Sequence, residues 1–298
     1  MSDDLSLAIR PARAADKDAV LAFCAHTFDD GDYLPEVWDE WLADPKGRLL
    51  VGALNGVAVG AAKVTMLTPT EAWLEGLRVD ERYRHLGLAW QLHVRCLQTA
   101  RDLGAKAARL VTSSRNTAVH RIAERAGMRH VASCLDMVGP ALSSQGVRAP
   151  LVPLKADDWP HVAARVLRSP ILEMTHGLYG AWCCWQALTE AKLRAHLSQG
   201  QVLSLPQESR ATTGLAITLE ARWDALPVAH LEATGAHLEA LALALRRQAS
   251  YAGLPAAEVV IPDDADLRQV LERAGYKNDM KPEAVLWIYE IDCAGALP

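Results

Sequence analysis

The chain has 298 residues, half of them hydrophobic and 22% charged, and its formal net charge is −5. This composition predicts a globular protein of one large or two ordinary domains, and it gives no support to nucleic-acid binding, which usually needs a basic face. No apolar run approaches the ~18–20 residues that cross a bilayer, and the first residues, MSDDLSLAIR, lack signal-peptide character. We therefore expect a cytoplasmic protein without membrane contact.

The six cysteines form no C-x-x-C pair, and the adjacent Cys183 and Cys184 do not have metal-ligand spacing. They are interpreted as small buried apolar residues in a reducing compartment. The sequence therefore predicts no metal site.

The segment from 27 to 44, TFDDGDYLPEVWDEWLAD, combines aromatic and acidic side chains. The aromatic residues are Tyr33, Trp38 and Trp41, and the acids include Asp29, Asp30, Asp32, Glu36, Asp39 and Glu40. An acidic rim with aromatic rings would attract a cationic amine, which makes Tyr33 and Trp38 candidate substrate-binding residues. The alternative is a solvated amphipathic helix whose two tryptophans pack inward.

The stretch from 73 to 92, WLEGLRVDERYRHLGLAWQL, is the most informative in the chain. Alternation predicts a strand with Trp73, Glu75, Leu77 and Val79 on one face and Leu74, Gly76 and Arg78 on the other. A polar loop follows, and a helix opens around Gly87. A glycine there leaves room for the backbone to approach a ligand, and the unpaired N–H groups and positive dipole end of a helix start suit a phosphate.

The elements that follow give this turn a context. A helical stripe of Leu88, Leu92, Cys96, Ala100 and Leu103 ends at Gly104, which fits a C-cap. A strand is expected over 107–112, and then a helix that begins at Asn116 and closes with Gly127-Met128. The alternative is an ordinary strand–helix–strand connection with a chance glycine.

The second half of the chain repeats the first. Residues 119–128 are echoed by 267–276, and the strands before them, 107–111 and 256–260, also correspond. These matches lie 148 and 149 positions apart, about half the chain, which is the signature of a tandem duplication. A boundary in the stretch GPALSSQGVRAP divides the chain into domains of residues 1–145 and 146–298.

The two halves differ where a phosphate would bind. Leu74-Glu75-Gly76 corresponds to Leu231-Glu232-Ala233, 157 positions later, so about eight residues are missing before the next helix of the second half. The missing segment is the one that holds Arg84 and the phosphate turn. We therefore expect the second domain to lack a cofactor site, and an unrelated α+β domain is the alternative.

The residues Arg84-His85-Leu86-Gly87-Leu88-Ala89 fit the pattern Arg/Gln-x-x-Gly-x-Gly/Ala, and the order of elements around them resembles the core of the GNAT superfamily of N-acyltransferases. The resemblance implies an α/β (α+β) fold class, with two tandem GNAT folds. In each fold a mixed, mostly antiparallel sheet with a splayed central strand pair is flanked by helices. It also implies acetyl-CoA as cosubstrate.

The same resemblance assigns roles to individual residues. The strand Leu77-Arg78-Val79 would bind the pantetheine arm, and the turn from Arg84 to Ala89 would cradle the pyrophosphate. Glu75 would be the catalytic base, or else a solvated or ion-paired strand residue. Asn116 would contact the pantetheine, or else serve only as an N-cap. The family's usual acid, a tyrosine, is replaced here by Ala123, which leaves the proton donor for the thiolate unidentified.

The combination of Asp32-Tyr33-Leu34-Pro35, Glu75 to Val79 and a degenerate second half resembles the histidine N-acetyltransferase group. It implies an N-acetyltransferase acting on the primary amine of a small molecule, with a free amino acid among the candidates. The alternatives are a non-catalytic acetyl-CoA-binding sensor and a protein N-acetyltransferase. Because the fused second copy can cover the surface through which such domains pair, we expect a monomer or weak homodimer.

Overall fold

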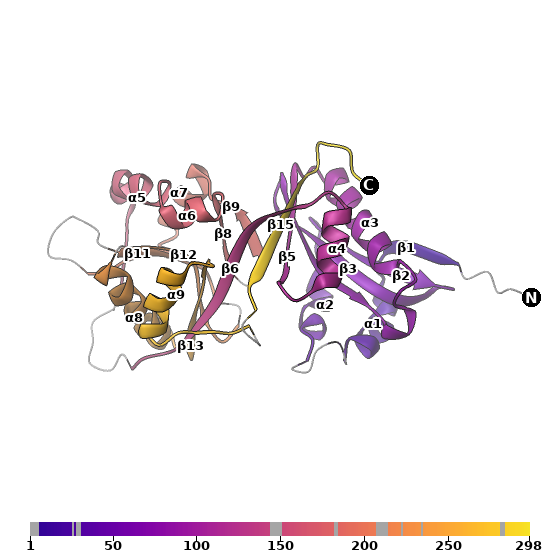
Figure 1. Ribbon diagram of the computed structural model, residues 1–298, viewed down its shortest axis with the longest axis horizontal. Coiled ribbons are helices and arrows are strands. Elements are labelled where there is room, and N and C mark those ends of the chain that lie inside the picture. Colours follow the sequence, from indigo (N-terminus) through magenta and orange to yellow (C-terminus); the bar gives the residue numbers. More distant parts are fainter. Residues whose placement is uncertain are drawn as a thin grey trace, which may run out of the picture. The chain divides into compact units, whose positions relative to one another are not determined.

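The computed structural model describes residues 6–25, 27, 31–143, 151–181, 184–206, 214–221, 223–233, 235–280 and 284–298. Asp29, Asp30, Thr234 and the expected domain boundary between 145 and 146 lie outside these residues. The chain forms two compact units (Figure 1). The first comprises Met1–Val111, Asn116–His130 and Tyr289–Pro298, and the second comprises Thr112–Arg115 and Val131–Ile288.

The sheet of the first unit has the strand order β1-β2-β3-β4-β5-β15. Its strands are β1 (Leu7–Pro11), β2 (Arg48–Leu54), β3 (Val57–Thr68), β4 (Glu71–Val79), β5 (Ala107–Ser113) and β15 (Leu286–Asp292). Of the last two, the residues up to Val111 and those from Tyr289 onward belong to this unit. Its helices are α1 (Lys17–Cys24), α2 (Leu34–Ala43), α3 (Leu88–Asp102) and α4 (Thr117–Arg125), with short 3₁₀ turns at Ala14–Asp16 and Glu81–Tyr83. Strands β1 to β4 are antiparallel, whereas β4 and β5 run parallel.

The helices of the first unit cover both faces of its sheet. A Cβ at Gly60 would meet Leu88 and Leu92 of α3. The next residue, Ala61, belongs instead to the buried cluster formed with α1 and α2. Because neighbouring strand residues face opposite ways, α3 covers one face and α1 and α2 cover the other.

The last strand of the chain completes the first unit. Strand β15 hydrogen-bonds with β5 (Figure 1). The buried Arg109 guanidinium on β5 pairs with Glu71 of β4 at 2.8 Å and with Glu290 of β15 at 2.7 Å. The Cys293 N–H donates to the Lys106 carbonyl at 2.8 Å. The C-terminal residues are thus a structural part of the first unit.

The sheet of the second unit has the order β6-β13-β12-β11-β10-β7, with β14 beside β6. Its strands are β6 (Arg129–Pro140), β7 (Val152–Pro153), β10 (Val202–Ser204), β11 (Gly214–Thr218), β12 (Leu226–Ala233), β13 (Ala256–Pro262) and β14 (Lys277–Asn278), and β8 (Leu178–Ala181) and β9 (Cys184–Ala187) form a separate hairpin. Its helices are α5 (Trp159–Val166), α6 (Pro170–Met174), α7 (Glu190–Ser198), α8 (Ala236–Tyr251) and α9 (Ala265–Arg273), with a 3₁₀ turn at Ala156–Asp158. The described strand pairs are antiparallel apart from β12 and β13, which run parallel.

Each unit therefore has a mixed, mostly antiparallel sheet that includes a parallel pair and is flanked by helices, which confirms the predicted fold class. Within the described residues, no helix has both the length and the apolar character to span a membrane. Over the same residues, no three His, Cys, Asp or Glu side chains are grouped to hold a metal ion.

Candidate active site

The parallel strands β4 and β5 separate along their length. They pair at Glu71↔Ala107, Ala72↔Ala108 and Trp73↔Arg109. In the described residues no pairing between them continues past this point, although β4 extends to Val79 and β5 to Ser113. A splayed strand pair opens here, as the resemblance to the GNAT superfamily implied.

Strand β4 carries a bulge at Gly76. Lys63 of β3 pairs with Glu75 and Ala61 pairs with Arg78, so β4 uses one residue more than β3 over this interval. Gly76 has a φ of +67°, in the left-handed region that glycine adopts readily. Simple alternation put Glu75 and Arg78 on opposite faces of the sheet. That prediction is wrong, because the bulge brings them onto the same face.

Helix α2 packs directly on this bulge. A Cβ at position 76 would lie 2.6 and 2.7 Å from the Trp41 ring atoms Cζ3 and Cη2. Glycine is thus needed both for the backbone conformation and for the close approach of the indole. The sequence held a signal for the bulge that the strand prediction did not use, since an isolated glycine inside a strand pattern often marks one.

An ion pair joins the start of α2 to β4. The Arg78 Nε donates to Asp32 Oδ2 at 2.7 Å, and the Asp32 side chain is 1% exposed. Asp32 Oδ1 also accepts from the Leu34 N–H at 3.1 Å. The Arg78 guanidinium lies 5.4 Å from the centroid of the Tyr33 ring. The Arg78 side chain is therefore held on the α2 face, so its expected contact with a pantetheine arm rests on its backbone.

Glu75 lies on the same face and is partly exposed. The Thr65 hydroxyl donates to Glu75 Oε1 at 2.5 Å. The cross-strand neighbour Lys63 directs its buried ammonium elsewhere, into an ion pair with Asp44 and a 3.1 Å bond to the Val64 carbonyl. Glu75 is thus a carboxylate on one strand of the splayed pair, and the Thr65 hydroxyl of β3 orients it. This arrangement suits a residue that accepts a proton.

The two candidate acceptor-binding aromatic residues have different environments. Tyr33 is 39% exposed and stands edge-on to Trp41, with ring centroids 5.9 Å apart. Trp38 is fully buried in the cluster under α1 and α2, with no partner for its indole N–H among the described residues. The assignment of Trp38 to the acceptor pocket is therefore corrected: it is a core residue that fixes α2 to the sheet.

The end of the loop between β4 and α3, together with the first turn of α3, presents a set of free backbone donors. Among the described residues, the N–H groups of residues 85 to 90 have no protein acceptor. His85 and Gly87 both have positive φ, +67° and +76°, and a Cβ at Gly87 would meet nothing within 4 Å. Consecutive N–H groups at the start of a 15-residue helix make a concave site of positive potential. These residues fit a pyrophosphate.

Two anchors hold this loop in place. The Asp80 carboxylate accepts from the Arg82 N–H at 3.0 Å and from its guanidinium at 2.6 Å, and this pairing lowers the Asp80 pKa. Helix α3 packs tightly because Gly52 and Gly60 bring the sheet against the Leu88 side chain. Leu88 is 3% exposed, so only its backbone is available to a ligand, whereas Arg84, His85 and Leu86 are exposed.

Asn116 and Ala123 mark the helix α4. The Asn116 side chain accepts from the Val119 N–H at 3.3 Å, so it caps the helix. Ala123 is fully buried. On β15 the Tyr289 hydroxyl donates to Glu124 at 3.2 Å, and burial, with Glu124 adding to it, raises the pKa of Tyr289 to about 12. Tyr289 therefore fastens β15 to α4 and is a weak proton donor at neutral pH.

The second unit has a counterpart of the splayed pair but not of the phosphate turn. Strands β12 and β13 pair from Leu226↔Ala257 to Val228↔Val259, and β8 packs against both. Only residues 234 and 235 separate β12 from α8, whereas residues 80 to 87 separate β4 from α3.

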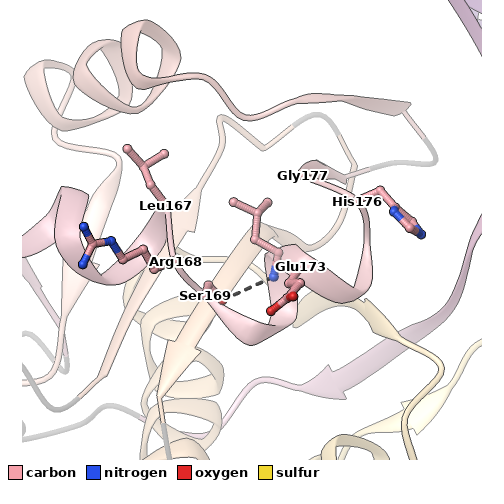
Figure 2. A pocket seen from close by; sticks show the side chains of 7 residues that line it. Leu167, Arg168, Ser169, Glu173, His176 and Gly177 are labelled. Atoms are coloured by element: carbon pink, nitrogen blue, oxygen red, sulfur yellow. Dashed lines mark hydrogen bonds between the residues drawn. The ribbon is translucent and has the colours of Figure 1, made fainter.

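Glu232, the counterpart of Glu75, is 5% exposed. Burial raises its pKa, while a hydrogen bond from Ser169 acts in the opposite direction. Ser169 also lines a cavity of about 480 Å³ whose other residues all come from the same segment, 167 to 177 (Figure 2). The cavity is thus formed by helix α6 and by the residues just before and after it.

Comparisons with known proteins agree with this geometry. Residues 19–128 match the model of the Acetyltransferase (GNAT) family. The structure of a GCN5-related N-acetyltransferase from Sphaerobacter thermophilus is similar over 98% of this chain and 96% of its own, with 16% identity and a TM-score of 0.63. A tandem GNAT protein from the clavulanic acid biosynthesis pathway is similar over 98% and 100%, with 14% identity and a TM-score of 0.56. These likenesses show a shared fold. No curated protein sequence matches the chain.

Proposed function

We propose that this chain, whose first unit carries a GNAT-family acetyltransferase domain, moves an acetyl group from acetyl-CoA to the primary amine of a small molecule. One observation carries the proposal. The free N–H groups of residues 85 to 90 open a helix beside a splayed strand pair, inside the segment that matches the family model. Family membership supports acetyl transfer in general, and the geometry supports the roles of the individual residues.

Acetyl-CoA supplies the activated acetyl group as its thioester. The turn from Arg84 to Ala89 would hold its pyrophosphate through backbone N–H groups and the Arg84 charge. The backbone of Leu77, Arg78 and Val79, beyond the point where β4 leaves β5, would hold the pantetheine arm. The Asn116 oxygen already caps α4, so a contact from Asn116 would come from its amide nitrogen.

Glu75 would act as the base. An amine must lose its ammonium proton before it attacks a thioester, and Glu75 is the partly exposed carboxylate of β4 on the face shared with Arg78. Thr65 would orient the carboxylate through its hydrogen bond to Oε1. A backbone N–H of the opened strand would stabilise the developing oxyanion.

The acceptor would bind on the face that α1 and α2 cover. The exposed Tyr33 ring and the partly exposed Glu75 provide an aromatic and anionic surface there, and the largely buried Arg78–Asp32 pair lies beside the ring. This chemistry suits a small cationic amine, free amino acids among them. The resemblance to the histidine N-acetyltransferase group makes histidine the first acceptor to test.

A non-catalytic acetyl-CoA sensor is the second candidate, and the buried Ala123 at the family's acid position favours it. The second unit would bind no cofactor in either case, because only two residues separate β12 from α8. An acetylating enzyme releases thiol when acceptor is present, whereas a sensor binds the cofactor and releases none. A protein acetyltransferase would release thiol with lysine peptides and not with free amines.

The test combines binding and thiol release. Calorimetry should find one acetyl-CoA site per chain, and Gly87→Glu should weaken binding at least tenfold, about 1.4 kcal/mol, because a carboxylate would compete with the phosphate. Gly56→Glu is the matched control, since Gly56 also has a positive φ of +85° and open space around it. Two sites per chain, or equal affinity for both variants, would contradict the assignment of the turn. A thiol-release screen over amino acids, polyamines, aminoglycosides and lysine peptides then identifies the acceptor class.

A further inference from the structure

An aromatic ring and an arginine stack beside the phosphate turn. The guanidinium carbon of Arg125, at the end of α4, lies 4.1 Å from the centroid of the Trp90 ring, in the first turn of α3. Trp90 is partly exposed and Arg125 is exposed. Neither side chain supports the catalytic chemistry described above, and neither belongs to the residues that resemble the family pattern.

The stack is close to the free N–H groups, because the N–H of Trp90 is itself the last of them. Leu88 and Leu92 face the sheet and are buried. Trp90, half a helical turn from each, therefore points away from the sheet and toward α4. A group bound on the N–H groups of residues 85 to 90 and a group bound by Arg125 would lie at the same end of α3.

Resting on the proposed function, we propose that Arg125, held in place by the Trp90 ring, binds the 3′-phosphate of coenzyme A. One ribose separates this phosphate from the pyrophosphate, so a ligand whose pyrophosphate sits on the turn carries a second anion to the same end of α3. Stacking leaves the in-plane N–H donors of the guanidinium directed outward, where they can pair with phosphate oxygens. The ring fixes the guanidinium before the ligand arrives, which reduces the ordering that binding requires.

The experiment compares two ligands by calorimetry on the full chain: coenzyme A and its 3′-dephospho form. Wild type should bind coenzyme A roughly tenfold more tightly, as one charge-assisted phosphate contact would provide. Arg125→Gln should remove this preference by weakening coenzyme A binding about tenfold, with no change for the dephospho form. Trp90→Leu should reduce the preference to about threefold, because the charge stays but its position is lost. Arg95→Gln removes an exposed charge from the same helix and should leave the preference intact.

The outcomes separate this inference from the proposed function. Equal loss of affinity for both ligands in Arg125→Gln would overturn it and show that Arg125 acts on the pyrophosphate or on folding. If Trp90→Leu keeps the full tenfold preference for coenzyme A over its dephospho form, the stacking of Trp90 on Arg125 has no role in binding the 3′-phosphate. Failure of wild type to bind either ligand would refute the proposed function itself. The preference should also shrink as salt rises, because an exposed ion pair is screened.

Discussion

Replacing Gly76 with alanine should be one of the most disruptive single-methyl changes in the first unit. Two costs add at this position. An L-residue at φ +67° pays about 1–2 kcal/mol for the left-handed backbone. The new methyl would also sit 2.6 Å from the Trp41 ring, and overpacking of this kind costs about 1–3 kcal/mol. We expect Gly76→Ala to lower the free energy of unfolding by roughly 2–5 kcal/mol.

Urea unfolding measures this loss, and two further variants divide it into its parts. Gly56→Ala has a similar φ, +85°, but no atom within 4 Å of the new methyl, so it should show only the backbone cost. In a Trp41→Leu background, Gly76→Ala should cost less than in wild type, because the clashing ring is gone. If Gly76→Ala is no more destabilising than Gly56→Ala, the reasoning about the packed bulge is refuted.

Three further predictions address the base, a buried carboxyl and the last strand. Glu75→Gln should lower the rate of thiol release at pH 7 by roughly 10²–10³-fold and leave the affinity for acetyl-CoA unchanged. If the variant releases thiol at the wild-type rate, Glu75 is a structural residue and not the base. Burial, together with Glu258 and Asp279, raises the pKa of Asp136 from 3.8 to about 8, so the stability that this carboxyl contributes below pH 4 is lost as pH rises to 8. The melting temperature of Asp136→Asn should therefore exceed that of wild type at pH 8 and equal it at pH 4. A difference in melting temperature that is the same at both pH values would contradict this. Arg109→Met should lower the free energy of unfolding in urea by about 3–5 kcal/mol, because Glu71 and Glu290 would both lose their ion-pair partner. The control Arg194→Met, at an exposed ion pair, should lower it by under about 1 kcal/mol. Similar losses in the two variants would contradict a structural role of Arg109 in holding β15 to β5.

The sequence predicted the parts of the fold that depend on local patterns. The helix from Leu88 to Asp102 follows a periodic apolar stripe and begins at a glycine, and both signals are contained in about fifteen residues. The splayed strands followed from the resemblance to the GNAT superfamily, and the short loop of the second unit followed from comparing the two halves of the chain. These features require no knowledge of distant contacts.

The features that the sequence did not predict depend on long-range contacts. The pairing of Asp32 with Arg78 joins residues 46 positions apart, and the pairing of Arg109 with Glu290 joins residues 181 positions apart. Neither ion pair has a local sequence signature, because the residues next to each carboxylate do not specify which distant arginine will pair with it. The bulge at Gly76 had a signal, but its effect on the direction of Glu75 and Arg78 depends on the register with β3. The burial of Trp38 was one of two possibilities that periodicity alone could not separate.

The two units differ at the two places where the first is proposed to bind phosphate and to accept a proton. The second unit retains the parallel pair β12–β13 and a 16-residue helix α8. It lacks a loop long enough to turn several successive N–H groups toward one anion before the helix begins. The carboxylate Glu232 remains, but burial raises its pKa, which stabilises the protonated form. Under the proposed function, loop length and the exposure of one carboxylate are the two local features that distinguish the units, and both differ while each unit keeps its parallel strand pair.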